Sequence, residues 1–123
     1  MKKILFILVT ITLSLTACAD NDQLVEYAEL PVVAQTFIRK YFNPSDVSYI
    51  KREREALHFE YNVYLKDATE IDFDHQGNLQ SIDCRHRAMP EGIVPELITS
   101  FVSLHHPDQI IVEYAIGYRY LSV

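Results

Sequence analysis

The sequence predicts an α+β domain in which helices are followed by antiparallel β-meanders. Two segments, beginning at Pro31 and Pro95, space their apolar residues as one face of a helix. The segments between them alternate apolar and polar residues, as half-buried strands do. Eight Tyr and six Phe against only three Gly also suit a sheet-rich domain with few loops.

An export signal precedes this domain. Two lysines are followed by the mostly apolar stretch 4–15, which is shorter than the roughly 20 residues that a membrane-spanning helix needs. Residues 15–18 read Leu-Thr-Ala-Cys, which resembles the bacterial lipobox, whose cysteine is acylated and becomes the new N-terminus. An ordinary cleaved signal with an incidental cysteine is the alternative. We predict a lipoprotein signal peptide over 1–17, then a lipidated Cys18 and an acidic tether over 18–29.

The residues after the cysteine bear on the destination of the protein. Ala19 stands where an Asp would favour retention in the inner membrane. Asp20 and Asp22 resemble the acidic tract with which some Gram-negative anaerobes send lipoproteins to the cell surface. We therefore expect an outer membrane lipoprotein that is periplasmic or surface-exposed.

The net charge restricts the possible partners, and the cysteine content restricts how the domain is stabilised. The formal net charge is −6 at pH 7, which argues against nucleic acid or an anionic bilayer surface, because both require a basic patch. We expect contact with the membrane through the lipid anchor only. Once Cys18 is acylated, Cys84 is the one remaining thiol, so an internal disulfide is impossible and the core must hold the domain.

The first predicted helix begins after Leu30 and ends at Asn43-Pro44. A strand starts at Val47 and continues through the mixed-charge run 51–55, which either guards an edge or contributes to an interface. The next strand places Leu57, Phe59, Tyr61, Val63 and Leu65 on one face. Further on, Thr69, Ile71 and Phe73 alternate with Glu70, Asp72 and Asp74, Gly77 marks a hairpin, and Ile82 and Cys84 share a face.

The second half repeats the first. Each helix has a Phe six residues after its opening Pro, and a second Pro three residues before the next strand. We therefore predict a duplicated helix-plus-meander unit within a domain over 30–123, with repeat one at 30–87 and a partial repeat two at 93–123. The helices should pack on one face of the sheet. The predicted core includes Phe37, Phe59, Tyr61, Val63, Ile71, Phe73, Leu97 and Phe101.

Five short motifs follow one another along the chain: a Leu-Pro helix start at 30–31, Tyr-x-Val-x-Leu at 61–65, Ile-x-Phe-Asp at 71–74, Pro-x-x-Ile at 95–98 and Gly-Tyr at 117–118. Together they resemble the PepSY-like, β-lactamase-inhibitor-like lipoproteins of Gram-negative anaerobes. The resemblance implies a four-stranded sheet per repeat with a helix across it, and a binding or inhibitory role. It defines no functional residues. This chain departs from the pattern at Val123, where another hairpin would follow.

Nothing in the sequence indicates catalysis or a cofactor. There is no Gly-x-Ser-x-Gly elbow and no Gly-rich phosphate loop, and Cys84 lies in mid-strand on the core side, where a thiol behaves as a small hydrophobe. The histidines lack metal-ligand spacing. Carboxylates on neighbouring strands could approach a cation, but alternating acids on a solvated face need no ligand, so no metal is expected.

The candidate binding face is the polar side of the first meander. Its residues mix aromatic, acidic and Arg side chains, as polar recognition surfaces do, although an ordinary solvated face is the alternative: His58, Glu60, Asn62, Tyr64, Asp72, Asp74 and Arg85, with Glu70, Asp83 and Arg87 beside them. A second candidate is an edge strand carrying Tyr118 and Tyr120, which could pair with another copy of the chain or with a partner's strand.

We therefore expect a non-enzymatic envelope lipoprotein that binds an unknown protein or peptide, with inhibition as one form of that role. The alternatives are a periplasmic small-molecule or cation-binding protein, and a truncated domain without independent function.

Overall fold

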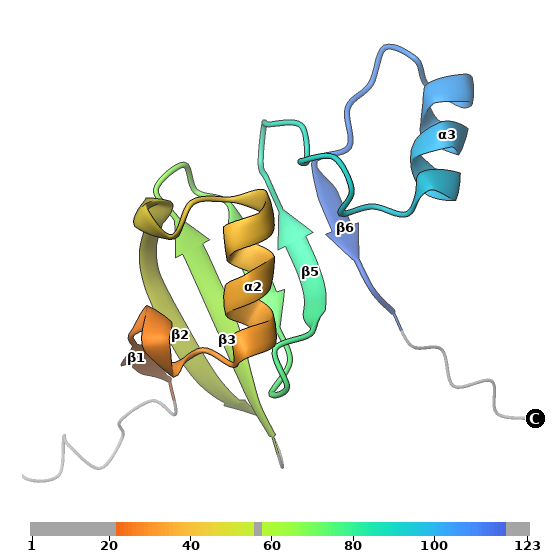
Figure 1. Ribbon diagram of the computed structural model, residues 1–123. Helices are drawn as coiled ribbons and strands as arrows, with labels where there is room; N and C mark the ends of the chain where they lie inside the picture. Colours follow the sequence, from red (N-terminus) through yellow and green to blue (C-terminus); the bar gives the residue numbers. More distant parts are fainter. Residues whose placement is uncertain (1–21, 56–57, 118–123) are drawn as a thin grey trace, which may run out of the picture.

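The computed structural model describes residues 22–55 and 58–117, and within them it forms one sheet and two α-helices (Figure 1). The predicted α+β class is confirmed. The antiparallel strands follow one another across the sheet in chain order. They are β1 (Gln23–Val25), β2 (Val47–Glu55), β3 (His58–Leu65), β4 (Glu70–Phe73), β5 (Leu79–Asp83) and β6 (Glu113–Ala115); the helices are α2 (Val32–Tyr41) and α3 (Glu96–His105).

Helix α2 forms where the sequence predicts it. Pro31 precedes its first residue, and the N–H of Phe42 donates to the carbonyl oxygen of Ile38 at 2.8 Å to close its last turn. The side of the helix that meets the sheet carries Ala34 and Ile38, which are fully buried, whereas Val33 is exposed. The small Ala34 lets the helix approach the sheet closely.

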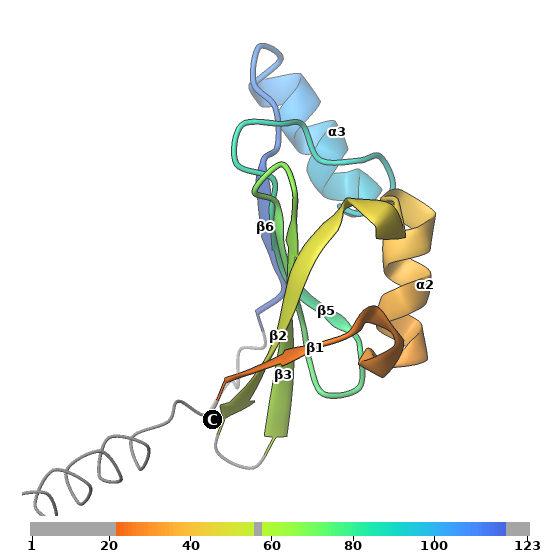
Figure 2. The ribbon, with the colours of Figure 1, turned by 90° about the vertical axis from the view of Figure 1, so that its left-hand side faces the viewer.

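The core lies between α2 and the strands beneath it. Ile50, Val63, Ile71 and Ile82 occupy one row across β2 to β5 and are all buried. The ring of Phe73 meets that of Phe37 from α2 edge to face, with centroids 5.6 Å apart. Each such fully buried side chain contributes roughly 1.5–3 kcal/mol to folding. Figure 2 shows α2 on one side of the sheet and no described element on the other.

The prediction that Phe59 belongs to the core is wrong. Phe59 points to the helix side of β3 but is 42% exposed, because β2 and β3 continue past the end of α2 (Figure 1). The guanidinium carbon of Arg52 lies 4.9 Å from its ring centroid and partly covers it. Leu57, which was predicted to share this face of the strand, lies outside the described residues.

Part of the expected tether belongs to the fold. Residues 23–25 form β1, which pairs with β2 so that Val25 lies opposite Ile50. A 3-10 turn follows at Tyr27–Glu29, where the Tyr27 hydroxyl donates to the carbonyl oxygen of Gln35 at 3.0 Å. A three-residue strand is too short to show alternation in the sequence, so this pairing could not be predicted from periodicity.

The second repeat departs most from expectation. Helix α3 begins after Pro95 as predicted, but Leu97 is 88% and Phe101 58% exposed, so their assignment to the core is wrong. The strand expected after this helix comprises only the three residues of β6, which pair with β5. Helix α3 lies on the same side of the sheet as α2 but beyond the β6 edge, where no described strand lies beneath it (Figures 1 and 2).

The signal peptide, the lipidated Cys18, and the edge strand with Tyr118 and Tyr120 also lie outside the described residues. In the described part of the chain, neither helix has the length and apolar character needed to cross a membrane.

Candidate functional site: the open face of the sheet

The surface opposite α2, which we call the open face, is formed by alternate residues of β2 to β5. The strand register places its side chains in rows across the sheet. One row runs through Lys51, Asn62, Asp72 and Ser81, and the next runs through Tyr49, Tyr64, Glu70 and Asp83. The residues predicted on β3 and β4 therefore lie together here. Tyr49, Lys51 and Ser81 belong to the same surface but were not predicted.

The first row is held by a hydrogen-bonded chain. Asn62 Nδ2 donates to Asp72 Oδ1 at 2.6 Å, and the Ser81 hydroxyl donates to Asp72 Oδ2 at 2.9 Å. Asn62 is only 7% exposed, so its amide depends on this partner. Because both carboxylate oxygens of Asp72 are engaged, the centre of the open face has a fixed arrangement.

The second row presents a pair of stacked tyrosines. The Tyr49 and Tyr64 rings lie 4.5 Å apart at an angle of 15°, and Lys51 Nζ is 5.9 Å from the centroid of the Tyr64 ring. Burial, together with the hydrogen bond that the Tyr64 hydroxyl makes to Glu70, raises the pKa of Tyr64 to about 12. The phenol therefore stays protonated and acts as a donor to a carboxylate.

Arg85 reaches the open face from the turn after β5, where its backbone has a φ of 60°. Its guanidinium lies 3.2 Å from the Asp83 carboxylate and 3.6 Å from that of Glu70, and its Nε donates to the carbonyl oxygen of Ala68. Arg85 therefore lies beside Glu70 and Asp83 on the open face. Arg87, also expected here, instead pairs with Asp67 at 3.3 Å beside a pocket among core residues.

Two local contacts lie at the end of the open face where β3 begins and the β4–β5 turn lies. His58 at the start of β3 stacks on His75 from the β4–β5 turn, with ring centroids 4.4 Å apart. Asp74 Oδ1 accepts the backbone N–H groups of Gln76 and Asn78, each at 2.9 Å. Asp74 therefore shapes the turn, a role that its place in the alternating pattern did not indicate.

Carboxylates dominate the charge of the open face: Glu53, Glu60, Glu70, Asp72 and Asp83 face two cations, Lys51 and Arg85. These acids do not converge on a point. Among residues 22–55 and 58–117, no group of three or more His, Cys, Asp or Glu side chains is placed to hold a metal ion. The surface is thus acidic and aromatic, suited to contact with an extended positive surface.

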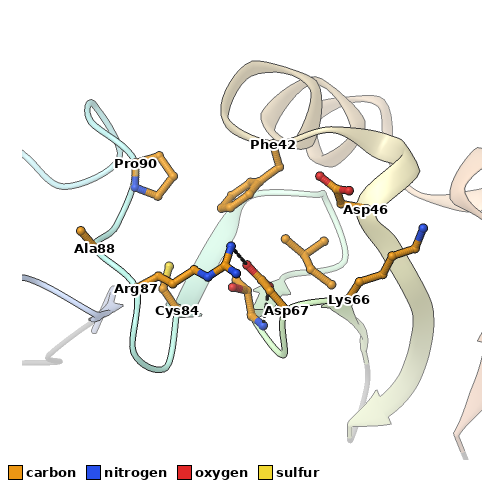
Figure 3. Close-up of a pocket in the computed structure, with 10 residues that line it drawn as sticks. Phe42, Asp46, Lys66, Asp67, Cys84, Arg87, Ala88 and Pro90 are labelled. Carbon is orange, nitrogen blue, oxygen red and sulfur yellow. Dashed lines mark hydrogen bonds and ion pairs between the residues drawn. The ribbon is translucent and has the colours of Figure 1, made fainter.

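A pocket of about 350 Å³ lies on the helix side, between the end of α2, the β3–β4 turn and the loop after β5 (Figure 3). Phe42 and Leu65 form apolar walls and the buried Cys84 lies at its base. Burial raises the pKa of the Cys84 thiol, so it behaves as the core residue that was predicted. This pocket could not be predicted from the spacing of residues in the sequence, because loops far apart in the chain form it.

Arg87 and Asp67, which both line the pocket, form an ion pair there. Burial alone would raise the pKa of Asp67, but hydrogen bonds from Thr69 and the charge of Arg87 hold that pKa below its ordinary value. Figure 3 shows the Arg87 guanidinium and the Asp67 carboxylate meeting under the Phe42 ring. The pocket therefore offers apolar walls and one charged pair.

Comparison with known proteins places these features in a wider group. A family model described as "Putative beta-lactamase-inhibitor-like, PepSY-like" matches residues 59–120, which include most of the open face and all of α3. No curated protein matches the chain.

Solved structures of three Bacteroides proteins resemble this fold. A protein of Bacteroides thetaiotaomicron described as a "putative calcium-regulated periplasmic protein" is 29% identical, with 78% of this chain and 76% of that chain covered and a TM-score of 0.74. A protein of Bacteroides vulgatus described as a "putative periplasmic protein" is 29% identical, with 80% of this chain and 78% of that chain covered and a TM-score of 0.75. Another from that species is 28% identical, with 78% of each chain covered and a TM-score of 0.73.

Proposed function

This chain belongs to the PepSY-like, β-lactamase-inhibitor-like family, and from that premise we propose that it is a non-enzymatic binding module of the cell envelope. The observation that carries the proposal is the open face, where stacked tyrosines lie beside a hydrogen-bonded polar row. Tyrosines held in place contribute contact area at an interface with little loss of side-chain entropy on binding.

The chemistry of the open face favours a basic protein or peptide segment as partner. Its five carboxylates would attract Lys and Arg side chains and accept charge-assisted hydrogen bonds from them. The exposed ring of Tyr49 would offer a partner's guanidinium a surface to stack on. A partner cation could also compete with Arg85 for Glu70 and Asp83, because the ion pairs that Arg85 makes with them are partly exposed and therefore weak.

The proposed location is the outer membrane, through acylation at Cys18. The periplasmic description of the similar Bacteroides proteins supports a place in the envelope. Such a tether would present the open face to proteins of the same compartment.

The test uses the chain 19–123, which contains every described residue, immobilised and exposed to an envelope extract. Replacing Tyr49→Ala together with Glu53→Lys should remove the captured protein, because both residues lie on the open face and contribute no buried contact to the core. The matched control is Val32→Ala, at an exposed position on α2. Capture should also weaken as salt rises, since exposed charges are screened. Equal capture by both variants would contradict the proposal.

A second candidate function is small-ligand binding in the pocket beside Arg87, whose volume lies near the lower limit of known ligand sites. A cation is a separate possibility because one similar protein is described as calcium-regulated. Calcium at about 100 times its Kd would add about 2.7 kcal/mol of stability. We expect Ca²⁺ to leave the melting temperature of the chain unchanged. A clear upward shift would favour a cation-binding function over the one proposed.

A further inference from the structure

The pocket beside Arg87 joins an apolar interior to a charged rim (Figure 3). Three of the residues that line it, Leu65, Thr69 and Cys84, are buried. Among the described residues, no buried side-chain nitrogen or oxygen lacks a hydrogen-bond partner, so the interior has no free polar side chain to offer a ligand. A polar group placed there would lose its hydrogen bonds with water without replacement. The interior therefore favours an apolar ligand body.

The volume of the pocket limits the size of the ligand. The pocket measures about 350 Å³, which equals about a dozen water molecules at their share of liquid volume, roughly 30 Å³ each. A compact ligand of about ten non-hydrogen atoms would therefore fill most of it. The Phe42 ring lies over the pocket (Figure 3) and would give a flat ligand an aromatic surface to stack on.

The two charged groups of the ion pair differ in what they can still offer a ligand. Both carboxylate oxygens of Asp67 are engaged: Oδ1 accepts the backbone N–H of Thr69 at 3.0 Å, and Oδ2 lies 3.3 Å from Nη1 of Arg87. Arg87 meets Asp67 through Nη1, whereas a guanidinium carries five N–H donors, and the Arg87 side chain is 73% exposed. Donors therefore remain available where the acceptors are already used, and a carboxylate fits this place better than an ammonium group.

The other charges at the rim do not reverse this preference. Lys66 and Asp46 line the pocket on the side away from Arg87 (Figure 3). Their charges are opposite, so they largely cancel for a group that binds at Arg87. A pair between Arg and a carboxylate is among the stronger hydrogen-bonded contacts and is frequently bidentate, so Arg87 should decide the sign of the ligand.

We propose that this pocket binds a small monocarboxylate with an apolar body, its carboxylate on Arg87 and its body between Phe42 and Leu65. The proposed ligand class rests on the small-ligand candidate function described above and is independent of the open face, which lies on the other side of the sheet. An exposed ion pair is weak, so a ligand carboxylate can share Arg87 with Asp67 or replace it. Phenylacetate has the required size and charge and serves as the probe.

The test is a titration of the chain 19–123 with phenylacetate, followed through backbone amide signals in NMR spectra. A ligand of this size binds with a Kd on the order of 1 mM. The signals of Asp67, Thr69 and Arg87 should therefore shift and saturate at millimolar concentrations, while that of Asn62 on the open face stays in place. The neutral phenylacetamide and the cationic phenethylamine carry the same ring, and each should bind at least about tenfold more weakly.

Two substitutions at the ion pair should act in opposite directions. Arg87→Gln should weaken phenylacetate binding about tenfold or more, the effect of losing a hydrogen bond to a charged group. Asp67→Asn keeps an oxygen that can accept the Thr69 N–H but removes the charge that competes for Arg87, so it should strengthen binding. Damage to the fold would weaken binding in both variants. The control Arg39→Gln removes the same charge at an exposed position on α2 and should bind as the wild type does.

Several results would overturn the proposal. The lack of a saturable shift at millimolar concentrations would show that the pocket does not take this class of ligand. Equal affinity for phenylacetamide would remove the role of charge, and higher affinity for phenethylamine would assign the pocket to cations. Equal binding by Arg87→Gln, or weaker binding by Asp67→Asn, would show that Arg87 does not hold the carboxylate.

The pocket and the open face can be tested separately. The variant Tyr49→Ala with Glu53→Lys, which should abolish capture of a protein by the open face, should leave phenylacetate binding unchanged. Arg87→Gln should in turn leave the capture unchanged, because Arg87 lies on the helix side of the sheet at the pocket. Failure of one proposal is therefore distinguishable from failure of the other.

Discussion

At the level of single residues, Tyr64 links the open face to the stability of the fold. Its pKa is raised to about 12 in the folded protein, against about 10 for a phenol in an unfolded chain. A raised pKa means that the folded state holds the proton more tightly. The stabilisation is therefore complete below pH 10 and is lost as the pH rises from 10 towards 12.

We expect Tyr64→Phe to remove this step from the pH dependence of unfolding. The free energy of unfolding of the wild type should fall more steeply above pH 10 than that of the variant. A phenolate absorbance titration, taken as wild type minus variant, should show a midpoint near 12 in buffer and near 10 in urea. A midpoint near 10 in buffer would mean that the hydrogen bond from Tyr64 to Glu70 does not form.

Asp72 gives a second test at this scale, because Asn62 is buried and Asp72 is the partner of its amide. Asp72→Ala should lower the free energy of unfolding by about 1–3 kcal/mol, the cost of leaving a buried donor unsatisfied. Asn62→Val combined with Asp72→Val should recover much of that loss, since neither partner is then left polar. Urea unfolding measures both. A double variant less stable than Asp72→Ala would show that the pair is not coupled as described.

At the level of elements, the contact between α2 and the β4–β5 turn depends on glycine. Gly77 has a φ of +88°, and a Cβ added there would lie 2.7 Å from Pro31 Cβ and 3.0 Å from the backbone nitrogen of Ala34. Gly92 has nearly the same φ, +93°, but its added Cβ would meet only the Tyr41 ring at the ordinary distance of 3.5 Å. The two positions therefore share the backbone requirement and differ in the space available.

Gly92→Ala should cost about 1–2 kcal/mol, the penalty of a left-handed backbone with a side chain. Gly77→Ala should cost about 1–3 kcal/mol more, because the start of α2 must also move. Urea midpoints of the two variants give the comparison directly. Equal losses of unfolding free energy in the two variants would show that the turn and the helix are not in close contact.

The burial of some elements could be predicted from the sequence and that of others could not, for physical reasons. The row of Val63, Ile71 and Ile82 was predictable because a strand under a helix must alternate. Phe59 obeys the same alternation, but a pattern does not tell where the covering helix ends. The exposure of α3 could not be predicted for the same reason. The spacing of its residues predicts an apolar face, but spacing does not show whether another element covers that face.

At the scale of the whole molecule, the candidate site was only partly visible in the sequence. Alternation on β3 and β4 identified Asn62, Tyr64 and Asp72 as sharing one face. The same rule applied to 47–55 would have added Tyr49 and Lys51, but the mixed charges of that run obscured its polar side. The turn residue Arg85 and the pocket depend on how loops return to the sheet, which no local pattern encodes.

The last prediction concerns how the whole molecule is held in the envelope. We predict that the protein is held by acylation at Cys18, because acyl chains buried in a bilayer give a protein affinity for the membrane. Cys18→Ala should abolish labelling by a fatty-acid probe and move the protein out of the membrane fraction.

The chain provides a matched control in its second cysteine. Cys84 is buried in the core, so Cys84→Ala removes a thiol without touching the predicted lipid site, and this variant should keep both the label and the membrane fraction. The comparison separates loss of acylation from loss of a cysteine in general. A Cys18→Ala variant that still carries the probe and stays with the membranes would place the anchor elsewhere in the chain.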